Sequence, residues 1–234
     1  MENNLKEVRK ELILHGLSEK TQMNYLQSLK QLQHYYGKSV GVLTKEEIKD
    51  YLFYLINTKQ LSQSSITIVY SAARFYFKYL HGDKNLMEEI PRVKKQKRLP
   101  QVLAREEVKD LINSLHNIKH KCLLLTTYSG GLRVSETAHL LVSDIDSKRM
   151  VIRVNQGKGK KDRYTILSNA NLKWLREYYR HYRPCSWLFP GYDKNRAIGT
   201  RTIQKVFDNA KQKAKITKDV TVHSLKAQLC DAPY

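Results

Sequence analysis

Apolar residues recur at helical spacing through the first ninety residues of the chain. Four helices are marked in this way by Leu5, Val8 and Leu12, by Tyr25, Leu26, Leu29 and Leu32, by Ile48, Tyr51, Leu52 and Leu55, and by Ile66, Val69, Ala73 and Phe77. Ser18 is placed to cap the second helix, and Thr44 with Glu47 three residues later forms a capping-box pattern before the third. Residues 1–90 are therefore predicted to fold as a small all-helical bundle.

The pattern is interrupted by a basic stretch between two prolines. Residues 91–100 read PRVKKQKRLP and offer little to bury. This composition predicts a linker between two domains.

Residues 101–234 combine helices with two short strands. The apolar run Cys122–Thr127 predicts a buried helix that ends at Gly130 and Gly131, because glycine reaches positive φ without strain. Met150–Val154 alternate as in a strand, and Tyr164–Leu167 can pair back across a glycine-rich turn. The faces of the later helices are marked by Val134, Ala138 and Leu141, by Leu172, Leu175, Tyr179 and Tyr182, and by Ile203, Val206, Phe207 and Ala210. This half is predicted to be mainly α-helical with a small antiparallel sheet.

Net charge is the strongest signal in the composition. The chain carries 42 Lys and Arg against 22 Asp and Glu, a formal charge of +20 with a pI near 9.8. Such an excess indicates a polyanionic partner, with nucleic acid as the first candidate and a membrane surface as the alternative. Because the sequence shows neither a secretory signal nor a spanning apolar run, we expect no membrane association and a cytoplasmic, nucleoid-associated location in a bacterium.

Cysteine and histidine give no indication of a metal site. Cys122, Cys185 and Cys230 are widely spaced and form no CxxC pair, so neither disulfides nor zinc are expected. His116 and His120 share a helical face but lack the glutamate of an HExxH motif. Surface histidines are the simpler interpretation.

Candidate chemistry is concentrated between Tyr128 and Ser168. Arg133 follows the Gly-Gly break, which would set it at a rigid corner. The tip between the two strands carries Lys158, Lys160, Lys161 and Arg163. A fixed arginine can fork onto phosphate oxygens, and a lysine on a tip can reach a backbone phosphate or a leaving oxygen. Spacing alone is equally consistent with a solvated basic hairpin and a surface arginine.

The order of several motifs carries more information than any one of them. GLRVSE at 131–136 precedes the first strand, GKGKKDR at 157–163 precedes the second, and LFPG at 188–191 and HSLK at 223–226 follow. With RLPQVLAREEV at 98–108 before them, the series resembles the tyrosine recombinases, the phage integrase family that includes Xer and integron-type integrases. The resemblance covers essentially the whole chain.

The resemblance implies a two-domain fold. Residues 1–90 would form the helical, SAM-like core-binding domain that clamps DNA, and residues 91–100 the basic linker. Residues 101–234 would form a mixed, mainly α catalytic domain with a small antiparallel β-sheet, the DNA breaking-rejoining fold, incomplete at its carboxyl end.

The resemblance also implies a reaction, DNA integration and recombination at specific sites. In the family a tyrosine attacks a phosphate of double-stranded DNA to form a 3′-phosphotyrosine, without metal or nucleotide cofactor, and the protein works as a homotetramer. Two arginines stabilise the pentacoordinate phosphorus and a lysine acts as acid to the leaving oxygen. These catalytic roles map onto Arg133, Lys158, His223 and Lys226, the last at the position of the family's second arginine.

DNA contacts are expected from both domains and the linker. The predicted set is Arg74, Lys78, Lys94, Lys95, Lys97, Arg98, Lys160, Lys161 and Arg163. For any single residue in the bundle, a solvated side chain beside core tyrosines remains the more ordinary interpretation. The total charge is the firmer signal.

The tail departs from the family pattern. Lys226 replaces an arginine, and lysine cannot fork onto a phosphate. Tyr234 lies eight residues beyond Lys226, too near for the family's nucleophile, so no nucleophile is assigned. We expect this chain to bind DNA without cleaving it, which leaves its status as an enzyme open. The alternative function is a truncated DNA-binding regulator or a dominant-negative partner of a full-length recombinase.

A frameshift near residue 226 is our hypothesis for this truncated tail. Family members commonly read Arg-His-Ser-Phe-Ala-Thr-His-Leu from this point. One back-translation of residues 226–234 is AAG GCA CAG CTT TGC GAC GCA CCT TAT, and removing one A gives codons for that sequence. The coding DNA tests the hypothesis, because a genuinely divergent terminus would have no LGH-like motif or tyrosine in a downstream frame.

Overall fold

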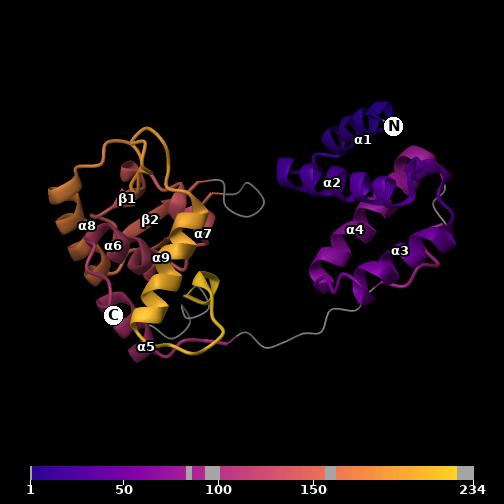
Figure 1. The fold of residues 1–234 in the computed structure, drawn as a ribbon. Helices are drawn as coiled ribbons and strands as arrows, with labels where there is room; N and C mark the ends of the chain where they lie inside the picture. The colour runs from indigo at the N-terminus through magenta and orange to yellow at the C-terminus, as the bar shows by residue number, and fades with distance from the viewer. Residues whose placement is uncertain (1, 83–85, 93–100, 156–161, 226–234) are drawn as a thin grey trace. The chain divides into compact units, whose positions relative to one another are not determined.

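The computed structural model describes residues 2–82, 86–92, 101–155 and 162–225. The chain divides into two compact units, residues 1–98 and 99–234, each with its own hydrophobic core (Figure 1). Predicted site residues in the linker, at the strand tip and in the tail lie outside the described residues. They are Lys94, Lys95, Lys97, Arg98, Lys158, Lys160, Lys161 and Lys226.

The first unit is the all-helical bundle predicted from the apolar spacing. Its elements are α1 (Glu2–Leu14), α2 (Glu19–Tyr36), η1 (Val40–Val42), α3 (Lys45–Asn57), α4 (Gln63–Tyr76) and the π-helical turn η2 (Phe77–His81). Helix α2 packs along α4, with α1 against α2 and α3 against α4. Leu12, Leu32, Ile48 and Ile66 are buried in the shared core, so the predicted faces point inward.

Local caps fix where these helices begin. Ser18 Oγ accepts a hydrogen bond from Thr21 N at 3.3 Å at the start of α2. At α3 the capping box is complete, because Thr44 Oγ1 accepts from Glu47 N and Glu47 Oε2 accepts from Thr44 N. Two side-chain acceptors thus satisfy backbone donors that a helix start leaves unpaired.

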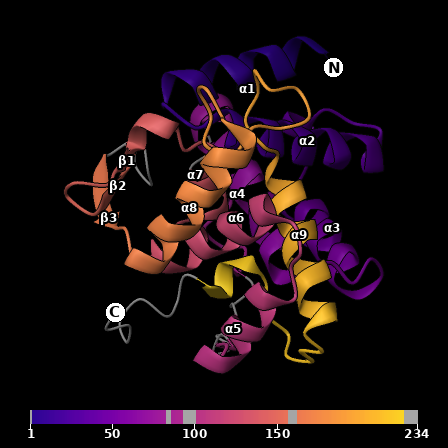
Figure 2. The ribbon, with the colours of Figure 1, turned by 90° about the vertical axis from the view of Figure 1, so that its left-hand side faces the viewer.

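The second unit places its helices around α6. Its elements are α5 (Arg105–Asn113), α6 (Ile118–Ser129), α7 (Val134–Ala138), η3 (Val142–Asp144), β1 (Ile145–Asp146), β2 (Val151–Val154), β3 (Arg163–Ile166), α8 (Asn169–Tyr182) and α9 (Thr200–Lys213). Helix α6 contacts α5, α7, α8 and α9. The strands form an antiparallel sheet in the order β1-β2-β3 at one edge of the unit (Figure 2). The predicted fold class is confirmed.

Three details of the second unit differ from the sequence prediction. Helix α7 ends at Ala138, so Leu141 lies on the next turn rather than on its face. Met150 has φ +57° and belongs to the turn before β2. In α8 the third inward position is Tyr178, whereas Tyr179 and Tyr182 are exposed, because Tyr178 packs on Phe189 and its hydroxyl donates to Leu188 O.

No helix in the described ranges combines the length and the apolar character that crossing a bilayer requires.

Candidate functional site

The corner between α6 and α7 is built by backbone hydrogen bonds. Helix α6 ends in a Schellman motif, in which Leu132 N donates to Thr127 O at 3.0 Å. Gly131 takes the left-handed position with φ +55°, where a side chain would be strained, whereas Gly130 has φ −87°. The turn ends at Arg133, the residue before the first turn of α7.

One carboxylate joins two arginines at this corner. Glu136 Oε1 accepts hydrogen bonds from Arg133 Nη1 at 2.7 Å and Arg163 Nη1 at 2.8 Å. Glu136 Oε2 accepts from the Arg133 backbone N at 2.7 Å and from Arg163 Nη2 at 2.9 Å. Arg163 therefore binds the carboxylate with both Nη atoms, whereas the Arg133 side chain uses one. We call these three residues the Glu136 clamp.

The Glu136 clamp combines a buried acid with half-exposed cations. The Glu136 side chain is 6% exposed, whereas those of Arg133 and Arg163 are each 35% exposed. Burial raises the pKa of Glu136, but hydrogen bonds from Arg163 and Arg133 outweigh it and lower the pKa to about 2. Two guanidinium charges and one carboxylate leave the clamp with about one net positive charge at neutral pH.

The sheet brings Arg163 to α7. Arg163 is the first residue of β3 and pairs with Val154 of β2. Thr165 Oγ1 donates to Gly130 O at 2.8 Å, which ties β3 to the α6–α7 corner. Arg163 and Glu136 lie 27 positions apart in sequence, so only the tertiary fold brings them into contact.

A second buried carboxylate supports strand β2. Asp144 accepts hydrogen bonds from Leu141 N at 2.9 Å, Arg153 Nε at 3.2 Å and Asn155 Nδ2 at 2.9 Å. Its side chain is almost fully buried. Asp144 therefore fixes the end of β2 to the turn that follows α7.

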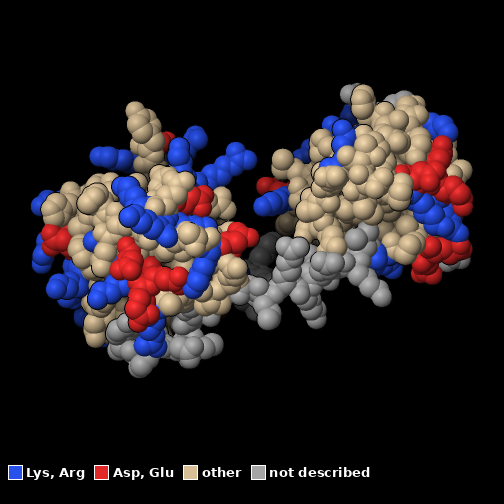
Figure 3. Space-filling model, turned by 60° about the horizontal axis from the view of Figure 1, so that its bottom comes forward, with Lys and Arg blue, Asp and Glu red and all other residues tan. Residues whose placement is uncertain are grey.

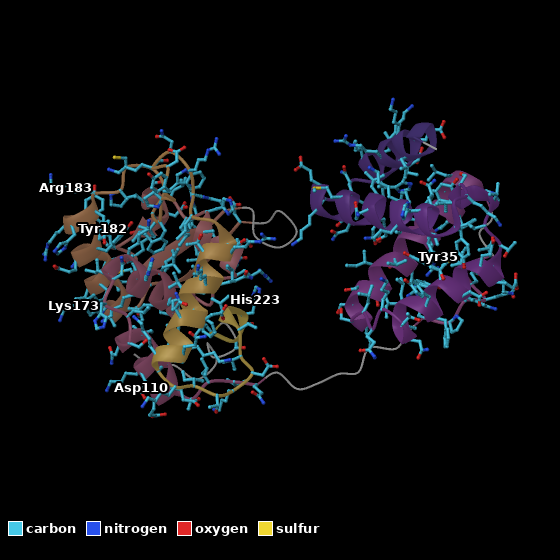
Figure 4. All side chains as sticks on the ribbon, in the orientation of Figure 1. Tyr35, Asp110, Lys173, Tyr182, Arg183 and His223 are labelled. Carbon is cyan, nitrogen blue, oxygen red and sulfur yellow. The ribbon has the colours of Figure 1, made fainter. Side chains whose placement is uncertain are left out.

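The other described site residues lie on different elements. His223 is exposed on the turn 222–225 between buried Val222 and Leu225, and it lies beside α9 in Figure 4. Arg74 is half-buried on α4, and Lys78 is exposed with Nζ 4.8 Å from the centre of the Tyr79 ring. Lys and Arg side chains are spread over both units (Figure 3). The roles assigned to these residues from the sequence stay predictions.

Sequence reasoning does not single out Glu136 or Asp144. A weak signal exists for Glu136, because an acid three residues after a helix start is the acceptor half of a capping box. Here that carboxylate accepts a hydrogen bond from the backbone N of Arg133. Its hydrogen bond with Arg163 is not indicated by any pattern in the neighbouring sequence. Within the described ranges, no group of three or more His, Cys, Asp and Glu side chains is arranged to bind a metal ion.

Two family models match the chain. Residues 101–232 match the model of the phage integrase family, and residues 5–85 match the SAM-like amino-terminal domain of phage integrases. A Sinorhizobium fredii protein named as an integrase/recombinase, y4qK, is 39% identical over 91% of this chain and 70% of its own length. A tyrosine recombinase of Thermosipho africanus is 26% identical over 89% of this chain and 77% of its own length.

Solved structures share the fold. A lambda integrase dimer bound to a COC′ core site matches with a TM-score of 0.78 at 17% identity, over 98% of this chain and 88% of that one. The XerH recombinase bound to a palindromic difH substrate matches with a TM-score of 0.74 at 18% identity, over 96% of this chain and 71% of that one.

Proposed function

Since this chain is a tyrosine recombinase of the phage integrase family, we propose that it binds double-stranded DNA and holds one backbone phosphate at the Glu136 clamp. The unequal use of the two arginines carries this proposal. Arg163 gives both Nη atoms to Glu136, whereas the Arg133 side chain donates from Nη1 alone. A guanidinium has five N–H donors, so Arg133 keeps donors for phosphate oxygens while Glu136 fixes its orientation.

The chemistry at the held phosphate follows from this arrangement. Arg133 would neutralise the negative charge of the phosphoryl oxygens, and its prior orientation by Glu136 reduces the ordering that binding requires. Arg163, predicted from sequence to contact DNA, is assigned to holding Glu136. Since no nucleophile is assigned in this chain, we propose that it holds the phosphate without cleaving the strand. We assign Lys158, His223 and Lys226 to further contacts with the phosphate, with Lys226 as a point charge rather than a fork. In a family member with its tyrosine nucleophile, the lysine at the position of Lys158 would protonate the leaving oxygen.

The first unit would contact the DNA backbone, and such contacts do not depend on the base sequence. Residues 63–81, which span α4 and η2, contain no Asp or Glu, and α2 contains only Glu19 at its first position. A surface without carboxylates avoids repulsion of phosphates. Arg74 and Lys78 lie on this segment, and we assign them to the DNA backbone. The same role is proposed for the basic residues of the linker and the strand tip, Lys94, Lys95, Lys97, Arg98, Lys160 and Lys161.

Assembly on DNA is the second part of the proposal. The lambda integrase neighbours include a dimer on a core site and a tetramer bound to a Holliday junction. We propose that this chain likewise assembles on paired duplex sites, as recombination between two duplexes requires. Such sites in a bacterium lie on the nucleoid, which is where we propose that it acts.

The experiment is a binding titration of the full chain with a labelled duplex at several salt concentrations. Each phosphate neutralised by the protein contributes about −0.9 to the slope of log K against log salt. We expect a steep slope for the wild type and a slope shallower by about 0.9 for Arg133→Ala. Arg176→Ala, which removes an exposed arginine from α8, is the matched control. A salt-independent affinity of the wild type would contradict the proposal.

A further inference from the structure

The loop between α8 and α9 holds one aromatic side chain entirely in solvent. Tyr192 is fully exposed, yet the backbone around it is tightly fixed. Gly191 N donates to Arg196 O at 2.7 Å, and Arg196 N donates to Asp193 O at 3.0 Å. These bonds close residues 191–196 into a tight turn, which we call the Tyr192 loop.

Hydrogen bonds made by side chains also hold the same loop. Trp187 Nε1 donates to Asn195 O at 3.1 Å, and Asn195 N donates to Asp193 Oδ1 at 3.0 Å. The Lys119 ammonium donates to Pro190 O, just before the loop. A tip held in this way keeps its side chains in position before any partner arrives, so binding loses less conformational entropy.

The charges beside Tyr192 are unbalanced. Lys194 and Arg196 are both exposed, with the Arg196 side chain 85% exposed. Asp193 is the one acid among residues 190–197, and its carboxylate already faces Asn195 N and Arg196 Nε. Singly exposed aromatics are common on protein surfaces. An exposed ring on a fixed loop that also carries two cations has the chemistry that contacts nucleic acid. The ring suits bases or sugars, and the ammonium and guanidinium groups suit phosphates.

The base of the loop lies next to the Glu136 clamp. Leu188 N donates to Leu140 O at 2.8 Å, which joins the chain before the loop to the residues after α7. Trp187, whose indole supports the loop, lines a cavity of about 410 Å³ together with Glu136. A duplex whose phosphate occupies the clamp would therefore run close to the loop.

We propose that the Tyr192 loop is a DNA-contact element, in which the Tyr192 ring packs into a groove of the duplex and Lys194 and Arg196 neutralise flanking phosphates. This inference rests on the proposed function. It adds residues that the sequence motifs do not indicate.

The test uses the full chain, a labelled duplex and the salt series described above. Aromatic contacts with bases are worth about 1–3 kcal/mol, so Tyr192→Ala should weaken binding by about fivefold or more with an unchanged salt slope. Tyr192→Phe keeps the ring and should bind within about twofold of the wild type. Lys194→Ala and Arg196→Ala should each make the slope shallower by about 0.9.

Matched controls come from α8. Tyr182→Ala removes an exposed tyrosine and Lys173→Ala an exposed lysine, and in Figure 4 both residues lie on α8, apart from His223. Both variants should bind as the wild type does. Trp187 donates to the loop, and Trp174 is the other tryptophan of the chain. In a Trp174→Phe background, unchanged fluorescence of Trp187 therefore shows that a substitution leaves the loop intact.

The outcomes separate this inference from the proposed function. If the wild type binds the duplex and Tyr192→Ala, Lys194→Ala and Arg196→Ala all match it, the loop does not contact DNA and the Glu136 clamp is unaffected. If the wild type does not bind, the proposed function fails and the loop assignment with it. If Tyr192→Ala disturbs the Trp187 signal, the slopes of the two charge variants decide.

Discussion

Replacement of Glu136 by glutamine is the substitution whose effect follows most directly from the structure. Glutamine keeps the shape of the side chain but removes its charge and turns one acceptor into a donor. That donor would face guanidinium and backbone N–H groups that now donate to the carboxylate. Glu136→Gln should therefore destabilise the second unit as well as misplace Arg133.

The magnitude comes from the pKa of the carboxyl. The folded chain lowers it from 4.5 to about 2. At about 1.4 kcal/mol for each tenfold change in proton affinity, the charged form contributes about 3 kcal/mol of stability at neutral pH. Because the folded pKa is the lower one, this contribution is complete above pH 4.5 and is lost as the pH falls toward 2.

Tryptophan fluorescence provides the assay. The sequence contains two tryptophans, Trp174 and Trp187, and both lie in the second unit. Urea unfolding followed by this signal therefore reports on the unit that contains the clamp. We expect Glu136→Gln to lose about 3 kcal/mol at pH 7, and the difference from the wild type to shrink between pH 4.5 and 2.

Glu106→Gln is the control, because Glu106 is an exposed acid in the first turn of α5. It should change stability by less than about 0.5 kcal/mol. A similar small loss for Glu136→Gln, with the same pH dependence as the wild type, would refute the role given to the clamp.

Three further substitutions test local elements of the two units. Gly131→Ala should cost about 1 kcal/mol in urea unfolding, because its φ of +55° is strained for a residue with a side chain; an unchanged transition would contradict the role given to this turn. Thr44→Ala should lower the stability of the first unit by about 1 kcal/mol by circular dichroism and leave the tryptophan transition unchanged. Asp144→Ala should lower the free energy of unfolding, followed by tryptophan fluorescence, by at least about 2 kcal/mol, because it leaves three donors unpaired. A loss below about 0.5 kcal/mol would show that solvent replaces the carboxylate.

Features with local causes are those that the sequence predicts well. The capping box at Thr44 and the glycine at the end of α6 depend on neighbours within a few residues, and both form as expected. The pairing of β2 with β3 follows from alternation on both sides of a turn. Arg133 follows the end of α6 and Arg163 begins β3, so the framework of the site is predictable from sequence.

The partner of those arginines depends on tertiary structure. Nothing near Glu136 in sequence indicates Arg163, which arrives through the register of β3. In α8, helical spacing alone allows Tyr178 or Tyr179 to face inward, and contact with Phe189 decides for Tyr178. Motif order identifies the family and Arg133, but it does not reveal how Arg133 is held or that Tyr192 is fully exposed on a hydrogen-bonded loop.

The most direct test of the central claim is a scan of single neutral phosphates. A duplex selected from a random pool for tight binding would carry one methylphosphonate at a time, and wild type and Arg133→Ala would be titrated against each duplex. If Arg133 holds one phosphate, neutralising that position should weaken the wild type and leave the variant unaffected, whereas all other positions should weaken both alike. If every position weakens both proteins equally, Arg133 does not hold a phosphate and the claim is contradicted.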